Sequence, residues 1–89
     1  MLHSYYDIPV RGVWLKNGLL HRSELPAITQ DGILEWYKND QRHRKDGPAI
    51  IDGDMKHWYL YGQHSRENGL PHVEAYGRKY WLVNGKFVE

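Results

Sequence analysis

The chain has 89 residues, and its 12 lysines and arginines nearly balance 11 aspartates and glutamates, which gives a formal net charge of +1. A chain of this size can form one small domain with a thin core, and it lacks the strongly basic balance of most proteins that bind duplex nucleic acid. It has no cysteine, which excludes disulfides, zinc sites built on thiolates and a catalytic thiol. We expect a cytoplasmic protein without membrane contact. The first residues lack the pattern of a secretion signal, and no apolar run approaches the roughly 18 residues of a membrane span.

Four tryptophans divide the chain into similar segments. Trp14, Trp36 and Trp58 are 22 residues apart, and Trp81 follows after 23. The residues after each tryptophan also repeat in register, with Asn or Gly at the turn and His-Arg at the end of two copies. A period of this length indicates that one supersecondary unit has been copied. We therefore predict a single domain over residues 1–89, with units at approximately 12–29, 30–51, 52–74 and 75–89.

Taken in chain order, residues 5–10 predict a leading strand, and each unit then shows the same succession of elements. A short apolar strand at 26–29 is followed by a turn at 30–32 and a longer aromatic strand at 33–38. The next copy has strands at 48–51 and 55–61, around the turn signal Asp52-Gly53-Asp54. A polar loop closes each unit. Glycine and proline in every unit argue against helices.

Alternation within the longer strands separates two aromatic faces. Leu34 and Trp36 point one way, whereas Glu35 and Tyr37 point the other. A flat sheet would leave one of these aromatic faces in water, which monomers seldom tolerate over a large patch. We therefore predict an all-β fold, an antiparallel meander of about seven strands built from β-hairpins of about 22 residues, which curls on itself or dimerises. The expected assembly is a homo-oligomer.

The basic and aromatic residues near the loops are the candidate ligand-binding residues. They are Arg22, Arg42, His43, Arg44, Arg66, Tyr37, Tyr59 and Tyr61. Arginine offers a planar fork of donors to phosphate or carboxylate, and a neighbouring aromatic ring can stack on a base. Alternatively, these arginines pair with acids of their own loops (Glu24, Asp46 and Glu67) and only stabilise the repeat. This structural explanation is favoured, because a residue present in every unit is first explained by what every unit needs.

No catalytic or metal-binding pattern stands out. The six histidines, at positions 3, 21, 43, 57, 64 and 72, lack the spacing of metal ligands, so we expect neither a metal nor a cofactor. Ser4, Ser23 and Ser65 have no Gly-x-Ser-x-Gly context, and the acids belong to turns. We expect a protein that is not an enzyme.

Residues 36–49 read Trp-Tyr-Lys-Asn-Asp-Gln-Arg-His-Arg-Lys-Asp-Gly-Pro-Ala. They match the pattern Trp-Tyr-x-Asn-Gly-x-x-His-Arg-x-Asp-Gly-Pro-Ala at every fixed position except Asp40. This pattern resembles tandem repeats in small proteins of tailed bacteriophages and large DNA viruses, similar in style to MORN and YwqK-type β-hairpin repeats. The resemblance covers nearly the whole chain from Trp14 onward.

The resemblance implies a virus-encoded accessory factor in the host cytoplasm. Such a factor would bind or sequester an anionic partner, for example a nucleotide-like host defence signal. Two alternatives remain open, namely a protein-interaction module that inhibits a host protein and a structural virion or assembly component. A virion component would use the repeats as a rigid spacer, whereas the other two functions would use them as a scaffold for recognition.

Overall fold

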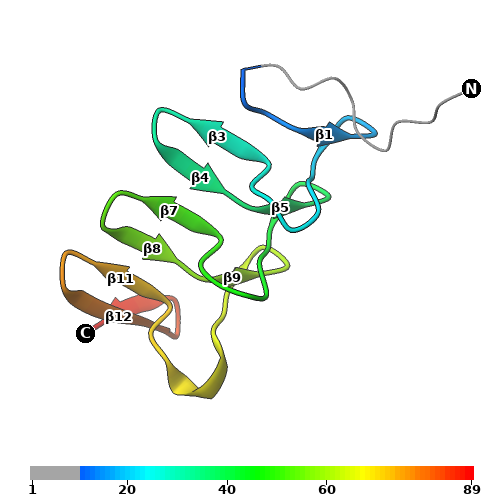
Figure 1. Cartoon of the computed structure of the whole chain (residues 1–89). Coiled ribbons are helices and arrows are strands. Elements are labelled where there is room, and N and C mark those ends of the chain that lie inside the picture. The colour runs from blue at the N-terminus through cyan, green and yellow to red at the C-terminus, as the bar shows by residue number, and fades with distance from the viewer. Residues whose placement is uncertain (1–10) are drawn as a thin grey trace, which may run out of the picture.

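The computed structural model describes residues 11–89, which form antiparallel β-strands without an α-helix (Figure 1). The predicted leading strand at 5–10 lies outside the described residues. One sheet contains β3 (Ile28–Gln30), β4 (Ile33–Glu35), β7 (Ile50–Asp52), β8 (Met55–His57), β11 (Val73–Ala75), β12 (Arg78–Val83) and β13 (Lys86–Val88). Its strand order is β13-β12-β11-β8-β7-β4-β3, which keeps the order of the chain, although other segments intervene between β4 and β7 and between β8 and β11. The all-β prediction and the seven antiparallel strands are confirmed.

Three short hairpins form a second row beside this sheet (Figure 1). They are β1 (Leu15–Lys16) with β2 (Leu19–Leu20), β5 (Tyr37–Lys38) with β6 (Gln41–Arg42), and β9 (Tyr59–Leu60) with β10 (Gln63–His64). The predicted continuous strands at 33–38 and 55–61 were therefore wrong, because each is interrupted at its tryptophan. The Trp36 N–H donates to the Ala49 carbonyl at 2.7 Å, and the Trp58 N–H donates to the His72 carbonyl at 2.9 Å. These bonds continue the registers of the β4–β7 and β8–β11 pairs, and the chain enters the following hairpin just after them.

Hydrogen bonds between consecutive hairpins recur 22 residues apart. The Asp40 N–H donates to the Leu20 carbonyl, and the Gly62 N–H donates to the Arg42 carbonyl, both at 2.8 Å. Asp40, which departs from the repeat pattern, also accepts the Leu20 N–H on its carboxylate oxygen Oδ1 at 2.6 Å. The departure at Asp40 therefore has a structural reason, since this carboxylate joins the first two hairpins.

Most of the hairpin turns contain two residues with positive φ, and the β7–β8 turn contains one, Gly53. Asn17-Gly18, Asn39-Asp40 and Asn84-Gly85 follow the preference of such turns for Asn, Asp and Gly. Tyr61-Gly62 and Tyr76-Gly77 have a tyrosine at the first position, with φ of 47° and 51°. A bulky residue in this conformation is a genuine outlier.

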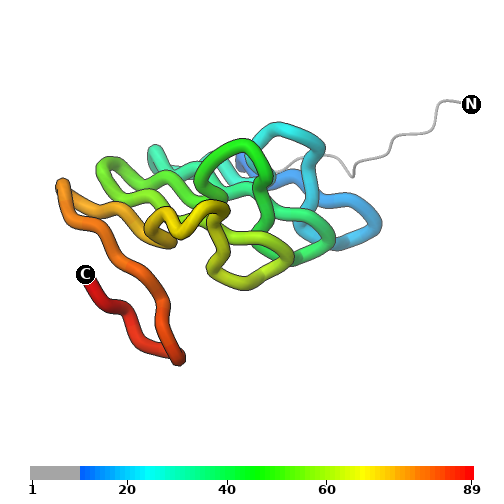
Figure 2. Tube along the Cα trace, turned by 90° about the horizontal axis from the view of Figure 1, so that it is seen from below, coloured from blue at the N-terminus to red at the C-terminus, as the bar shows by residue number. Residues whose placement is uncertain are grey.

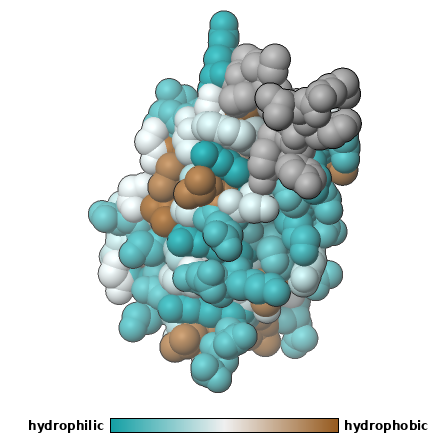
Figure 3. Space-filling model, turned by 45° about the vertical axis from the view of Figure 1, so that its right-hand side comes forward, coloured by the Kyte–Doolittle hydropathy of each residue, from teal (hydrophilic) through white to brown (hydrophobic). Residues whose placement is uncertain are grey.

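The core is thin, as a chain of this size implies. The buried hydrophobic residues among 11–89 are Ala27, Trp36, Ala49 and Val73. Hydrophilic side chains cover most of the surface in Figure 3, and the hydrophobic areas on that face are small and separate. Contacts between neighbouring hairpins must therefore supply much of the stability.

The last hairpin takes a different direction from the others (Figure 2). Strand β12 runs without interruption through Trp81, whereas the chain leaves its sheet strand at Trp36 and Trp58. His72 stands in the repeat where Ala27 and Ala49 stand, and its Nδ1 accepts the Leu82 N–H at 2.9 Å. This side-chain bond holds β12 extended beyond Trp81.

Candidate functional site

The three arginines of the repeat make the same contacts in each copy. The guanidinium carbon Cζ lies 3.8, 3.8 and 3.7 Å from a tryptophan ring centroid for the pairs Arg22–Trp14, Arg44–Trp36 and Arg66–Trp58. In each copy Nη1 also donates to a proline carbonyl, at 3.3, 3.1 and 3.2 Å for Pro26, Pro48 and Pro71. A guanidinium over the face of a tryptophan is a favourable cation–π pair. These arginines therefore stabilise the loops, while several of their five N–H donors remain for other partners.

The surroundings of the second arginine are the tightest. A Cβ atom at Gly47 would lie 3.0 Å from Arg44 Cζ, so the guanidinium fills the space between Trp36 and this glycine. Burial lowers the pKa of Arg44, and the nearby Asp46 carboxylate partly opposes this effect. Arg66 forms an ion pair with Glu74 of β11 at 2.6 Å, and not with an acid of its own loop.

The two histidines that precede these arginines connect neighbouring hairpins. His21 Nδ1 accepts the Asn39 N–H at 3.1 Å, and His43 Nδ1 accepts the Tyr61 N–H at 2.9 Å. Burial lowers the pKa of both histidines, and nearby lysines lower it further. For His43 these lysines are Lys38 and Lys45. The lowered pKa favours the neutral imidazole, which is the form that can accept a hydrogen bond at Nδ1.

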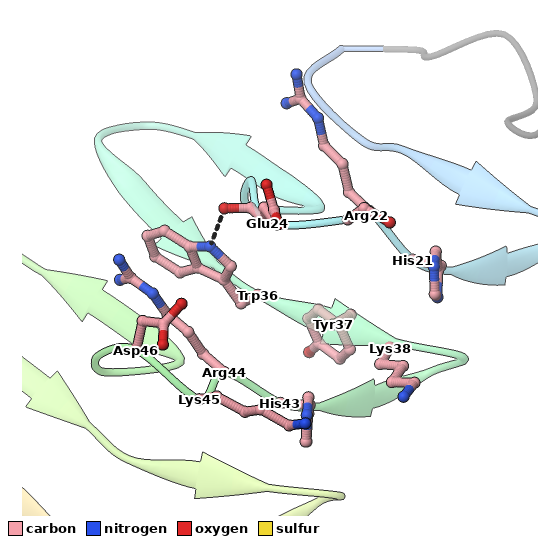
Figure 4. Close-up of a pocket in the computed structure, with 11 residues that line it drawn as sticks. His21, Arg22, Glu24, Trp36, Tyr37, Lys38, His43, Arg44, Lys45 and Asp46 are labelled. Carbon is pink, nitrogen blue, oxygen red and sulfur yellow. Dashed lines mark hydrogen bonds between the residues drawn. The ribbon is translucent and has the colours of Figure 1, made fainter.

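A groove lies between the loop that follows β2 and the loop that follows β6 (Figure 4). Its volume is about 360 Å³, and its cationic and acidic lining residues are Arg22, Lys38, Arg44, Lys45, Glu24 and Asp46. Trp36 lies between the two loops, and its indole N–H donates to the Glu24 carbonyl at 3.3 Å. A second groove of about 630 Å³ follows in the next copy and shares Arg44, Lys45 and Asp46 with the first. Arg44 and Lys45 therefore border both grooves.

Other predicted residues belong to a partly buried polar cluster, the interior cluster, which lies between the sheet and the hairpins; the Arg42 side chain in it is 42% exposed. Arg42 Nε lies 3.5 Å from Glu35 Oε1, and the Tyr37 hydroxyl donates to the same oxygen at 3.3 Å. The guanidinium carbon of Arg42 lies 5.9 and 5.5 Å from the ring centroids of Tyr37 and Tyr59. The Tyr59 ring in turn contacts the His64 ring, with centroids 4.1 Å apart. Tyr37 and Tyr59 thus lie on the short hairpins and not on a face of the seven-stranded sheet.

The structure therefore distributes the predicted residues over three places. Arg22, His43 and Arg44 lie at the first groove, Arg66 and Tyr61 lie at the second, and Arg42 and Tyr59 lie in the interior cluster. Tyr37 borders the first groove, although its hydroxyl is bonded to Glu35.

The candidate ligand-binding residues did not include Lys38 or Lys45, although Lys45 ends the densest basic stretch of the sequence, Arg42-His43-Arg44-Lys45. Lys38 repeats Lys16 at an interval of 22, which was a usable signal. Lys45 shows no such repetition, because Glu67 and Ser23 stand at the corresponding positions. Only the fold shows that both ammonium groups face one groove.

Two searches of the described residues concern metals and membranes. Among residues 11–89, no group of three or more His, Cys, Asp or Glu side chains is placed to hold a metal ion. No helix in this part of the chain has the length and apolar character needed to cross a membrane.

Comparison of the chain with protein-family models, with curated proteins and with solved structures gave no match in any of the three.

Proposed function

We propose that the protein is a non-enzymatic recognition module that binds an anionic partner in the groove between its first two loops. The observation that carries this proposal is the lining of that groove, which combines four cationic residues with two acids around a nearly buried tryptophan. The tandem hairpin unit supplies a rigid frame that presents these side chains at fixed positions.

The two lysines are the groups most available to a ligand. Lys38 and Lys45 are exposed, and neither forms an ion pair with a carboxylate within residues 11–89. The lowered pKa of His43, caused by burial and then by these two lysines, indicates a positive potential at the groove. An anion placed there would gain from both charges, and the effect would weaken as salt screens it.

A binding measurement with a simple polyanion tests the proposal. Sodium tripolyphosphate, titrated into the protein in a calorimeter at low salt, should bind with an affinity that falls as sodium chloride is added. The double variant Lys38→Gln/Lys45→Gln should lose at least tenfold in affinity. The matched control is Lys86→Gln, an exposed lysine on β13 outside both grooves, which should bind like the parent protein. Absence of binding, or equal binding by the double variant, would refute the proposal.

The resemblance to viral repeat proteins adds a biological setting to this proposal. A phage-encoded accessory factor in the host cytoplasm would act by sequestering a nucleotide-like defence signal. Native mass spectrometry of protein purified from infected cells tests this setting. Detection of a retained nucleotide-like compound would support it.

A second candidate function is a protein-interaction module, and the outer strand of the sheet favours it. All three residues of β13 are exposed, including Phe87 at 49% and Val88 at 46%, and no further strand pairs with its outer side among residues 11–89. An open edge of this kind accepts an extended segment of another chain. The other chain can be a second copy of this protein, which would make the assembly a homo-oligomer. The mass of the protein in solution tests for such an oligomer. Phe87→Lys should leave a self-associating protein monomeric.

A further inference from the structure

The turn between β9 and β10 begins with a residue that turn geometry does not favour. Tyr61 has φ of 47°, whereas the other copies place Asn17, Asn39 and Asn84 at this position. Asparagine tolerates this conformation far better than a residue with a bulky side chain. Tyr61 therefore costs stability at a site where asparagine would be the better structural residue. Tyr76 has the same conformation in a turn of the large sheet, so a functional reason for Tyr61 must lie in its surroundings.

The surroundings of the Tyr61 ring give that reason. Its residue surface is 53% exposed, and its ring centroid lies 4.1 Å from that of His43. The ammonium group of Lys38 lies 5.4 Å from the ring centroid. Tyr61 also lines the second groove together with Arg44 and Lys45. An exposed aromatic ring is thus fixed beside the cations of the proposed anion site.

We propose that Tyr61 is a stacking platform for the base of a nucleoside phosphate whose phosphates lie against Lys38 and Lys45. This inference rests on the proposed anion-binding function and assigns its ligand class. A simple anion would bind to the lysines alone and would have no stacking contact with the Tyr61 ring. A nucleoside phosphate uses both, because every base offers a π-face to an aromatic side chain and its phosphates need cations.

Two probes and three variants test the platform. Adenosine triphosphate and sodium tripolyphosphate are titrated separately by calorimetry into the parent protein, Tyr61→Asn, Tyr61→Phe and Tyr76→Asn. Tyr76 is the matched control, since it occupies the same position in a turn of the large sheet, is 72% exposed and lies outside both grooves.

We expect Tyr61→Asn to weaken binding of adenosine triphosphate by about tenfold or more, in line with the loss of one base stack. The same variant should bind tripolyphosphate like the parent protein, and its thermal midpoint should be unchanged or higher because asparagine suits the turn. Tyr61→Phe keeps the ring and should retain the affinity for the nucleotide. Tyr76→Asn should bind both probes normally.

The outcomes separate this inference from the function on which it rests. Equal affinity for the two probes, together with an unchanged Tyr61→Asn variant, would overturn the platform and leave the anion site standing. Failure of both probes to bind would overturn both. A parallel loss of both probes in Tyr61→Asn, with a lowered thermal midpoint, would show a merely structural tyrosine and would also overturn the platform.

Discussion

At the scale of single residues, neighbouring cations have separate roles. Arg44 is stacked on Trp36 and bonded to the Pro48 carbonyl, whereas Lys45 is exposed at the border of both grooves. The repeated arginine belongs to the construction of the loop. The lysine beside it, which the repeat does not require, is available to a ligand.

Replacement of Arg44 should therefore change stability. Arg44→Ala should lower the free energy of unfolding by about 1–3 kcal/mol, because it removes a cation–π pair and leaves a proline carbonyl without its donor. Urea unfolding followed by tryptophan fluorescence measures this. Lys45→Ala is the adjacent control and should change stability by no more than about 0.5 kcal/mol. Equal effects of the two variants would contradict the separation of roles.

Two glycines with the same backbone conformation should respond very differently to alanine. Gly12 and Gly32 have φ of +77° and +78°. A Cβ at Gly12 would overlap the Thr29 carbonyl oxygen, whereas a Cβ at Gly32 would meet no atom within 4 Å. Gly32→Ala should cost about 1 kcal/mol from backbone strain alone.

Gly12→Ala should cost clearly more, because it also displaces the segment that bonds to the outer side of β3 through the Thr29 N–H. Thermal unfolding of the two variants side by side measures the difference. If the two midpoints fell equally, the close approach of Gly12 to Thr29 would be disproved.

At the scale of elements, histidines connect the hairpins to one another and to the sheet. His21 and His43 accept backbone hydrogen bonds from the next hairpin, and His57 and His64 lie in the interior cluster with ring centroids 5.8 Å apart. Burial is the main cause that lowers the pKa of all four, and Arg42 lowers the pKa of the interior pair further. The folded chain thus favours neutral imidazoles.

Stability should consequently fall on mild acidification. The unfolded chain binds protons on these histidines near their ordinary pKa of 6.5, whereas the folded chain binds them only at lower pH. Between the lowered pKa values of the folded chain and 6.5, the unfolded state therefore binds more protons than the folded state. The free energy of unfolding consequently rises with pH, and it decreases as the pH falls below about 6.5. Urea midpoints measured between pH 7.5 and 5.5 test the direction. His57→Gln should flatten the profile, and a profile that rises on acidification would contradict the assignment.

The repeat period predicted the strands, the tight turns and their antiparallel order, because apolar alternation and Gly-containing turns are local signals. It could not predict the interruption at Trp36, because the last backbone bond of this segment to the sheet is made with Ala49 of the next copy, which is distant in sequence. The hydrogen bond from the Leu82 N–H to His72 in the last hairpin could not be predicted either, because the two residues meet only in the folded chain. The candidate site shows the same limit, since Lys38 and Lys45 approach one groove only through the stacking of two loops.

At the scale of the whole molecule, the sheet grows by addition of strands, and each strand pairs only with its neighbours in the strand order. The described part of the chain has no central core of large buried side chains. In such quasi-linear proteins, stability is roughly a sum of unit and interface contributions, and the ends open more easily than the middle.

Amide hydrogen exchange should therefore be slowest in β7 and β8, which have a strand on each side, and fastest in β13 at the outer edge. Exchange measured by NMR at neutral pH would show this as a gradient along the strand order. Equal protection in β13 and β7 would instead indicate that the whole chain opens as one unit, or that another chain covers β13.

The hydrogen bonds that join the first hairpin to the second reappear between the second and the third, with donors and acceptors displaced by 22 residues. A gene segment coding for residues 36–57 could be duplicated in frame, and the inserted copy would find the same neighbours on both sides. Recombination could therefore lengthen the chain one repeat at a time without changes to the existing copies. Each added copy would bring another groove, so the number of binding positions would evolve together with length.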